Sequence, residues 1–77
     1  MKHSTFEKNL YKELFNRFQN DEFHVDFERS TYPEDFEELR TALSNLGKSE
    51  ILIMIANEPD FIEVELDYRY CSKLKNI

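Results

Sequence analysis

Residues 51–70, ILIMIANEPDFIEVELDYRY, contain two contrasting hydrophobic patterns on either side of a turn signal. The first six residues are all apolar, which is typical of a strand with both faces buried. The turn signal is the tetrapeptide at 57–60, Asn-Glu-Pro-Asp. From residue 61 to about residue 70, apolar and charged residues alternate, as in a half-buried strand. The stretch therefore predicts a β-hairpin in which residues 51–56 form a central strand of a sheet.

A helix and a short strand are predicted at the start of the chain. Apolar residues recur at helical spacing between Phe6 and Phe18, and Ser4 with Glu7 matches the capping-box pattern. We expect this helix to span about 4–19. Residues 22–28, EFHVDFE, alternate between polar and apolar side chains and predict a strand.

A second helix is predicted between these strands. Thr31 and Glu34 match a capping box around Pro33, which is tolerated in a first helical turn. Gly47, the only glycine, is expected in a left-handed conformation just after the helix ends. The buried stripe of this helix is predicted to contain Phe36, Leu39, Ala42, Leu43 and Leu46.

The resulting order, α-β-α-β-β, predicts an α+β fold. Two helices pack on one face of a small three-stranded sheet, in a single domain that spans residues 1–77. Residues 72–77 are expected to form a frayed tail. Whether the 22–28 strand lies beside residues 51–56 or beside the last strand is left open by the pattern.

Catalytic and metal-binding motifs are incomplete in this sequence. Gly47-Lys48-Ser49 matches the end of a phosphate-binding loop, but Ala42 stands where that motif needs a glycine. His24, Asp26 and Glu28 share one strand face and suit a metal, yet a solvated strand face has the same pattern. A pairing of Cys71 with His24 has no local support. We therefore predict no enzyme activity, no cofactor and no metal.

The net charge of −6 is unevenly distributed along the chain. Residues 21–67 contain fourteen acidic and three basic residues, a net charge of −11, whereas both ends are basic. In the last predicted strand, three acidic residues share a face as a straight row with ~6.6 Å between neighbours. Such a row costs stability through repulsion and favours a surface that meets a basic partner. The predicted partner-binding residues are Asp26, Glu28, Glu58, Asp60, Glu63, Glu65 and Asp67.

An apolar strip is expected beside these carboxylates. One side of the 51–56 strand has to share their face, and we expect the smaller and more flexible set to be exposed there. That set includes Leu52 and Met54, and methionine suits an adaptable contact. Ile53 on the other side is then expected in the core.

These features predict a small acidic protein that acts as a stoichiometric inhibitor. Its carboxylates would occupy the basic site at which a larger protein holds nucleic acid, because such sites present Lys and Arg in arrays that complement phosphates. In composition the chain resembles inhibitors from phages and mobile elements, such as antirestriction, anti-CRISPR and nuclease immunity proteins. That resemblance includes no sequence motif, and it implies a nucleic-acid mimic without catalysis.

Other functions remain as alternatives. One is a regulatory or structural module that homodimerises through its exposed sheet face, with the carboxylates as a polar rim. The simplest is an acidic face that is only solvated. Direct nucleic-acid or membrane binding is not expected, because most of the basic residues lie near the chain ends and form no basic stripe in the sequence.

The cellular location follows from what the first residues lack. Residues 1–10 contain no apolar segment of the signal-peptide kind, and no apolar run approaches the ~18 residues of a membrane span. We expect a cytoplasmic protein, in the host cytoplasm if a phage encodes it.

Overall fold

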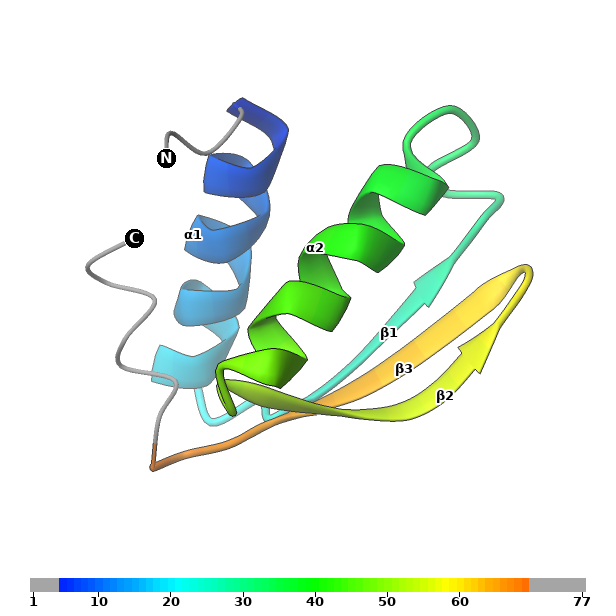
Figure 1. Ribbon diagram of the computed structural model, residues 1–77. Helices are drawn as coiled ribbons and strands as arrows, with labels where there is room; N and C mark the ends of the chain where they lie inside the picture. Colours follow the sequence, from blue (N-terminus) through cyan, green and yellow to red (C-terminus); the bar gives the residue numbers. More distant parts are fainter. Residues whose placement is uncertain (1–4, 70–77) are drawn as a thin grey trace.

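The computed structural model describes residues 5–69 and confirms the α+β class and the α-β-α-β-β order (Figure 1). The sheet is antiparallel with strand order β1-β3-β2, so β3 is the central strand and β2 is an edge. The prediction that residues 51–56 form a central strand is therefore wrong. The elements are α1 (Thr5–Gln19), β1 (His24–Glu28), α2 (Phe36–Lys48), β2 (Leu52–Glu58) and β3 (Phe61–Leu66).

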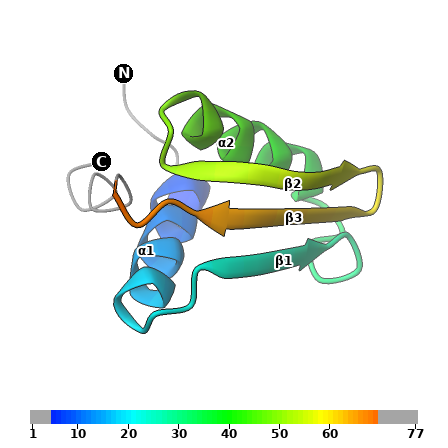
Figure 2. The same ribbon diagram turned by 90° about the horizontal axis from the view of Figure 1, so that it is seen from below.

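Both helices cover the same face of the sheet, and the other face is open (Figures 1 and 2). The core lies between the two layers and is apolar. Its best-buried side chains come from both helices and the central strand: Leu14, Leu39, Leu43, Ile62 and Val64 are each 0% exposed. Within residues 5–69, no helix combines the length and apolarity needed to cross a membrane.

The predicted ends of α2 are wrong at both termini. The helix begins only at Phe36, after Asp35 in the N-cap position, and no side chain caps it. Thr31 and Glu34 lie in the turns that precede the helix, so they form no capping box. Gly47 lies inside the helix, and the left-handed residue after it is Glu50, with φ 65°.

The hairpin differs from the prediction in two ways. β3 ends at Leu66, so the last strand is shorter than the predicted 61–70. β2 contains a bulge, because Met54 pairs with Val64 and Ala56 pairs with Glu63, which leaves Ile55 as the extra residue. The bulge shifts the alternation of the strand, so side chains after it face the opposite way from an unbroken pattern. Ser4 of the first predicted capping box and the predicted tail at 72–77 lie outside the described residues.

Candidate functional site

The open face of the sheet collects carboxylates from all three strands. The strand alternation turns Val25 and Phe27 of β1 into the core and leaves Asp26 and Glu28 exposed. Residues that pair directly in an antiparallel sheet share a face, which assigns the acidic residues of β2 and β3 to the same side. We call this surface the acidic face; it consists of Asp26, Glu28, Glu58, Glu63 and Glu65.

At the centre of the acidic face, Asp26 lies directly opposite Glu63 in the register of β1 and β3. The Nε2 atom of His24 lies 2.7 Å from a carboxylate oxygen of Glu63 and 3.3 Å from one of Asp26. The imidazole therefore bridges two carboxylates that would otherwise face each other without a partner. His24 itself pairs with Glu65 in the register, so its contact with Glu63 is diagonal across the strands.

This cluster has ligand types that suit a divalent transition metal. The nearest ligand atoms of His24, Asp26 and Glu63 all lie within 4.8 Å of one another. The sequence pattern placed Glu28 in this group, whereas the structure brings in Glu63 from the neighbouring strand. The same Nε2 atom lies close to both carboxylates, and His24 and Asp26 have half-exposed side chains.

Asp67 does not continue the row of Glu63 and Glu65. It follows the end of β3, and its side chain is 10% exposed. Its carboxylate accepts hydrogen bonds from the backbone N–H of Arg69 at 2.8 Å and from Arg69 Nε at 3.2 Å, with Nη2 2.9 Å from the other oxygen. Hydrogen bonds from the Arg69 side chain, then from its backbone, lower the pKa of Asp67. The part of the predicted row that lies in β3 therefore ends at Glu65, and the third carboxylate, Asp67, is paired with Arg69.

Asp60 also lies apart from the acidic face. It occupies the turn between β2 and β3, where its carboxylate accepts a hydrogen bond from Arg29 Nε at 2.9 Å. Its side chain is 82% exposed, so it stays accessible to a partner from the side of the turn. Two of the seven predicted residues, Asp60 and Asp67, are thus paired with arginines, and the other five form the acidic face.

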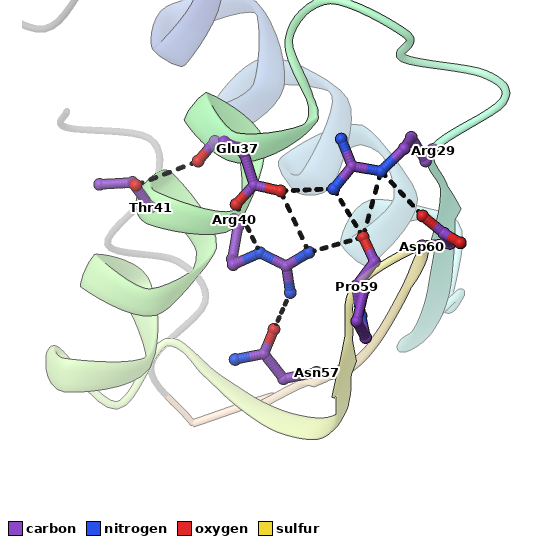
Figure 3. A network of polar contacts seen from close by, with 7 residues as sticks. All are labelled: Arg29, Glu37, Arg40, Thr41, Asn57, Pro59 and Asp60. Atoms are coloured by element: carbon purple, nitrogen blue, oxygen red, sulfur yellow. Dashed lines mark hydrogen bonds and ion pairs between the residues drawn. The ribbon is translucent and has the colours of Figure 1, made fainter.

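Two arginines hold the hairpin turn against the start of α2 (Figure 3). The backbone carbonyl of Pro59 accepts hydrogen bonds from Arg29 at 2.7 Å and from Arg40 at 3.0 Å. The Glu37 carboxylate accepts hydrogen bonds from both guanidinium groups, at 2.5 Å from Arg29 and 3.0 Å from Arg40. Arg40 also donates a hydrogen bond to the side chain of Asn57. The bulge in β2 explains the last contact, since it places Asn57 on the helix side, opposite the buried Ile62.

The same two guanidinium groups cover the ring of Phe36, at 4.9 Å for Arg29 and 5.2 Å for Arg40. Hydrogen bonds from Arg40, then from Arg29, lower the pKa of Glu37.

Both arginines of residues 21–67 therefore make their contacts on the helix side of the sheet and in the turn. Since β1, β2 and β3 contain no Lys or Arg, the strands supply neither of these cations to the acidic face.

The predicted apolar strip uses the wrong side chains. Leu52 is 2% exposed and lies in the core, and Met54 is partly buried against it, so neither forms an exposed contact strip. Ile53 is 55% exposed and Ile55 48%, and both border the acidic face on β2. The expectation that Ile53 belongs to the core is wrong, because more than half of its side chain is exposed. The run ILIMIA has no polar residue to reveal which side faces outward.

No family model, curated protein or solved structure matches the chain.

Proposed function

We propose that this protein is a stoichiometric inhibitor whose acidic face occupies the basic nucleic-acid site of a larger protein. The observation that carries the proposal is the concentration of five carboxylates on the open face of a sheet whose strands contain no Lys or Arg. The protein acts by binding and carries out no catalysis of its own. It works in the cytoplasm, where such targets meet nucleic acid.

The placement of these charges on strands supports the proposal. Carboxylates two residues apart on one strand are ~6.6 Å apart, and neighbouring strands are ~4.8 Å apart. The backbone fixes both spacings before any partner arrives, so binding costs little ordering of the protein. Charges held this close repel one another, and a partner that supplies Lys and Arg relieves that repulsion.

The arginine contacts of carboxylates outside the acidic face support the same conclusion. Asp60, Asp67 and Glu37 each have an arginine within hydrogen-bonding distance. On the acidic face, the described contacts of this kind are those of the His24 imidazole with Asp26 and Glu63. These three carboxylates outside the acidic face are paired with arginine, whereas the acidic face has no Lys or Arg on its strands and stays negative, which suits a groove that normally holds phosphates.

The experiment that tests the proposal is a displacement assay. A tagged copy of the chain first captures candidate targets from a lysate, and each target is then purified and loaded with a fluorescent DNA duplex or RNA. We expect the protein to release the labelled nucleic acid at a one-to-one ratio to the target's sites, as anisotropy would show. Binding that leaves the nucleic acid in place would overturn the proposal.

The salt dependence of binding provides a second measure. Exposed charges are screened beyond ~8–10 Å at physiological ionic strength. The affinity for the target should therefore fall steeply as salt rises, in parallel with the target's affinity for nucleic acid. An affinity that does not change with salt would point to an apolar contact and contradict charge mimicry.

A further inference from the structure

The second edge of the sheet, β2, is free of charge along most of its length. The strand order leaves β2 paired with β3 on one side only, so its other side presents unpaired backbone groups. Residues 51–57, ILIMIAN, include no Asp, Glu, Lys, Arg or Pro. Ile53 and Ile55 are the exposed large aliphatic side chains among the described residues, and both belong to this edge.

The opposite edge has a different character. β1 carries His24, Asp26 and Glu28 at alternate positions, which is how natural sheets discourage edge-to-edge pairing. β2 has one such device, the bulge at Ile55, and no charged residue before Glu58. The two edges therefore differ in their readiness to accept another strand.

We propose that two copies of this chain pair antiparallel through β2 to form one continuous six-stranded sheet. An antiparallel pair of identical strands is self-complementary, which is what a two-fold symmetric dimer requires. Ile53 and Ile55 of both copies meet beside the symmetry axis and cover part of one another's exposed surface. The unpaired backbone groups of each β2 then form hydrogen bonds across the interface.

The absence of charge on the β2 edge favours a second copy of the chain as the strand that pairs with it. A chain with a net charge of −6 repels its own copies wherever carboxylates meet. A contact through β1, or between two acidic faces, would bring several carboxylates together. The run at 51–57 carries no charge, so pairing through it brings carboxylates together only at its two ends, where Glu50 of one copy lies near Glu58 of the other.

The dimer also extends the acidic face, and this consequence rests on the proposed function. A two-fold axis perpendicular to the sheet keeps all four helices on one side and both acidic faces on the other. β3 and its counterpart are then three strand spacings apart, ~14 Å. The major groove of B-DNA is ~12 Å wide between its phosphate strands. The β3 carboxylates of the two copies thus lie at a separation similar to the width of that groove.

Analytical ultracentrifugation over a micromolar concentration series tests the dimer. Wild type should sediment with twice the chain mass of 9.3 kDa. The double variant Ile53→Lys, Ile55→Lys should sediment as a folded monomer, because it places charge at the interface. Asn9→Lys with Asn16→Lys is the matched control, since both are exposed on α1, and it should remain a dimer. Wild type that is monomeric throughout, or an isoleucine variant that still dimerises, would overturn the proposal.

Hydrogen exchange distinguishes an edge contact from a face contact. In the edge dimer, backbone amides of β2 become more protected as concentration rises, while those of β1 do not change. Protection that spreads to β1 instead would overturn pairing through the β2 edge. The displacement assay reports separately: a monomer that still displaces nucleic acid refutes the dimer alone, and a dimer that displaces none refutes the proposed function alone.

Discussion

Asp26 and Glu63 lie directly opposite each other on β1 and β3, two carboxylates in one cross-strand pair. His24 contacts both of them, and no Lys or Arg occurs in any of the three strands. Like charges in direct cross-strand pairs destabilise a sheet. The protein therefore tolerates repulsion at the centre of the surface that we propose meets a basic partner.

The replacement Asp26→Asn should stabilise the isolated protein. It removes one of two facing charges, while the amide oxygen can still accept a hydrogen bond from His24. We expect a gain of ~0.2–1 kcal/mol in the free energy of unfolding, the usual range of cross-strand pair effects. Glu28→Gln is the control, because Glu28 lies opposite Phe61 instead of a carboxylate. Urea titration of both variants at low salt measures the difference, and equal effects would contradict the account.

The replacement Leu39→Ala should threaten the fold as a whole. Leu39 is 0% exposed, and removal of such a side chain leaves a cavity and costs ~2–5 kcal/mol. A domain of this size rarely has more than ~3–5 kcal/mol in total. Ile55→Ala removes a similar volume from a site that is 48% exposed and should cost much less in the monomer. Thermal unfolding by circular dichroism at low concentration compares the two, and a similar loss in both would show that the core is misplaced.

The replacement Glu37→Gln should change how stability depends on pH. The pKa of Glu37 is lowered from 4.5 in the folded protein, because Arg40 and Arg29 donate hydrogen bonds to its carboxylate. The resulting stabilisation is fully present above the unfolded pKa and is lost as the pH falls through the lower, folded pKa. Wild type should therefore exceed the variant in stability near neutral pH, and this advantage should vanish in acid.

Denaturant titrations at a series of pH values measure this effect. Glu34→Gln serves as the control, because Glu34 is exposed and precedes α2 without a side-chain contact to either arginine. Its difference from wild type should stay nearly constant over the same pH range. An advantage of wild type over Glu37→Gln that persists in acid would contradict the role assigned to the two arginines.

The sequence predicted the elements well, because helix and strand patterns depend on residues close together in the chain. The stripe from Phe36 to Leu46 in α2 and the alternation in β1 each mark one buried face. Strand order depends on contacts between distant segments of the chain. An apolar run such as 51–56 does not reveal whether its strand is central or at an edge. The structure uses that run as an edge, with Ile51 and Leu52 buried and Ile53 and Ile55 exposed.

The candidate site was predicted in part for similar reasons. Alternation alone was enough to place Glu63 and Glu65 on one face of their strand, and Asp26 shares that face because β1 pairs with β3. The sequence did not predict the pairing of Asp67 with Arg69, because the pattern extended β3 to about residue 70 and the strand ends at Leu66. The contact of Arg29 with Asp60 joins positions 31 residues apart, which no local pattern reveals.

The most direct test of the central claim compares charge-removed variants in the displacement assay. The test variant carries Asp26→Asn, Glu63→Gln and Glu65→Gln, which remove three charges from the acidic face. The control carries Glu34→Gln, Asp35→Asn and Glu50→Gln, at three exposed residues that lie outside the strands. Both variants lose the same charge, so only the position of the charge differs between them.

The account predicts that the control releases labelled nucleic acid from the captured target as wild type does. The test variant should keep its fold but bind about a thousandfold more weakly, if each of three close charge pairs contributes ~1.5 kcal/mol. It should then release almost no nucleic acid at the same concentration. Equal displacement by the test variant and the control would show that the acidic face is only solvated, and would contradict the central claim.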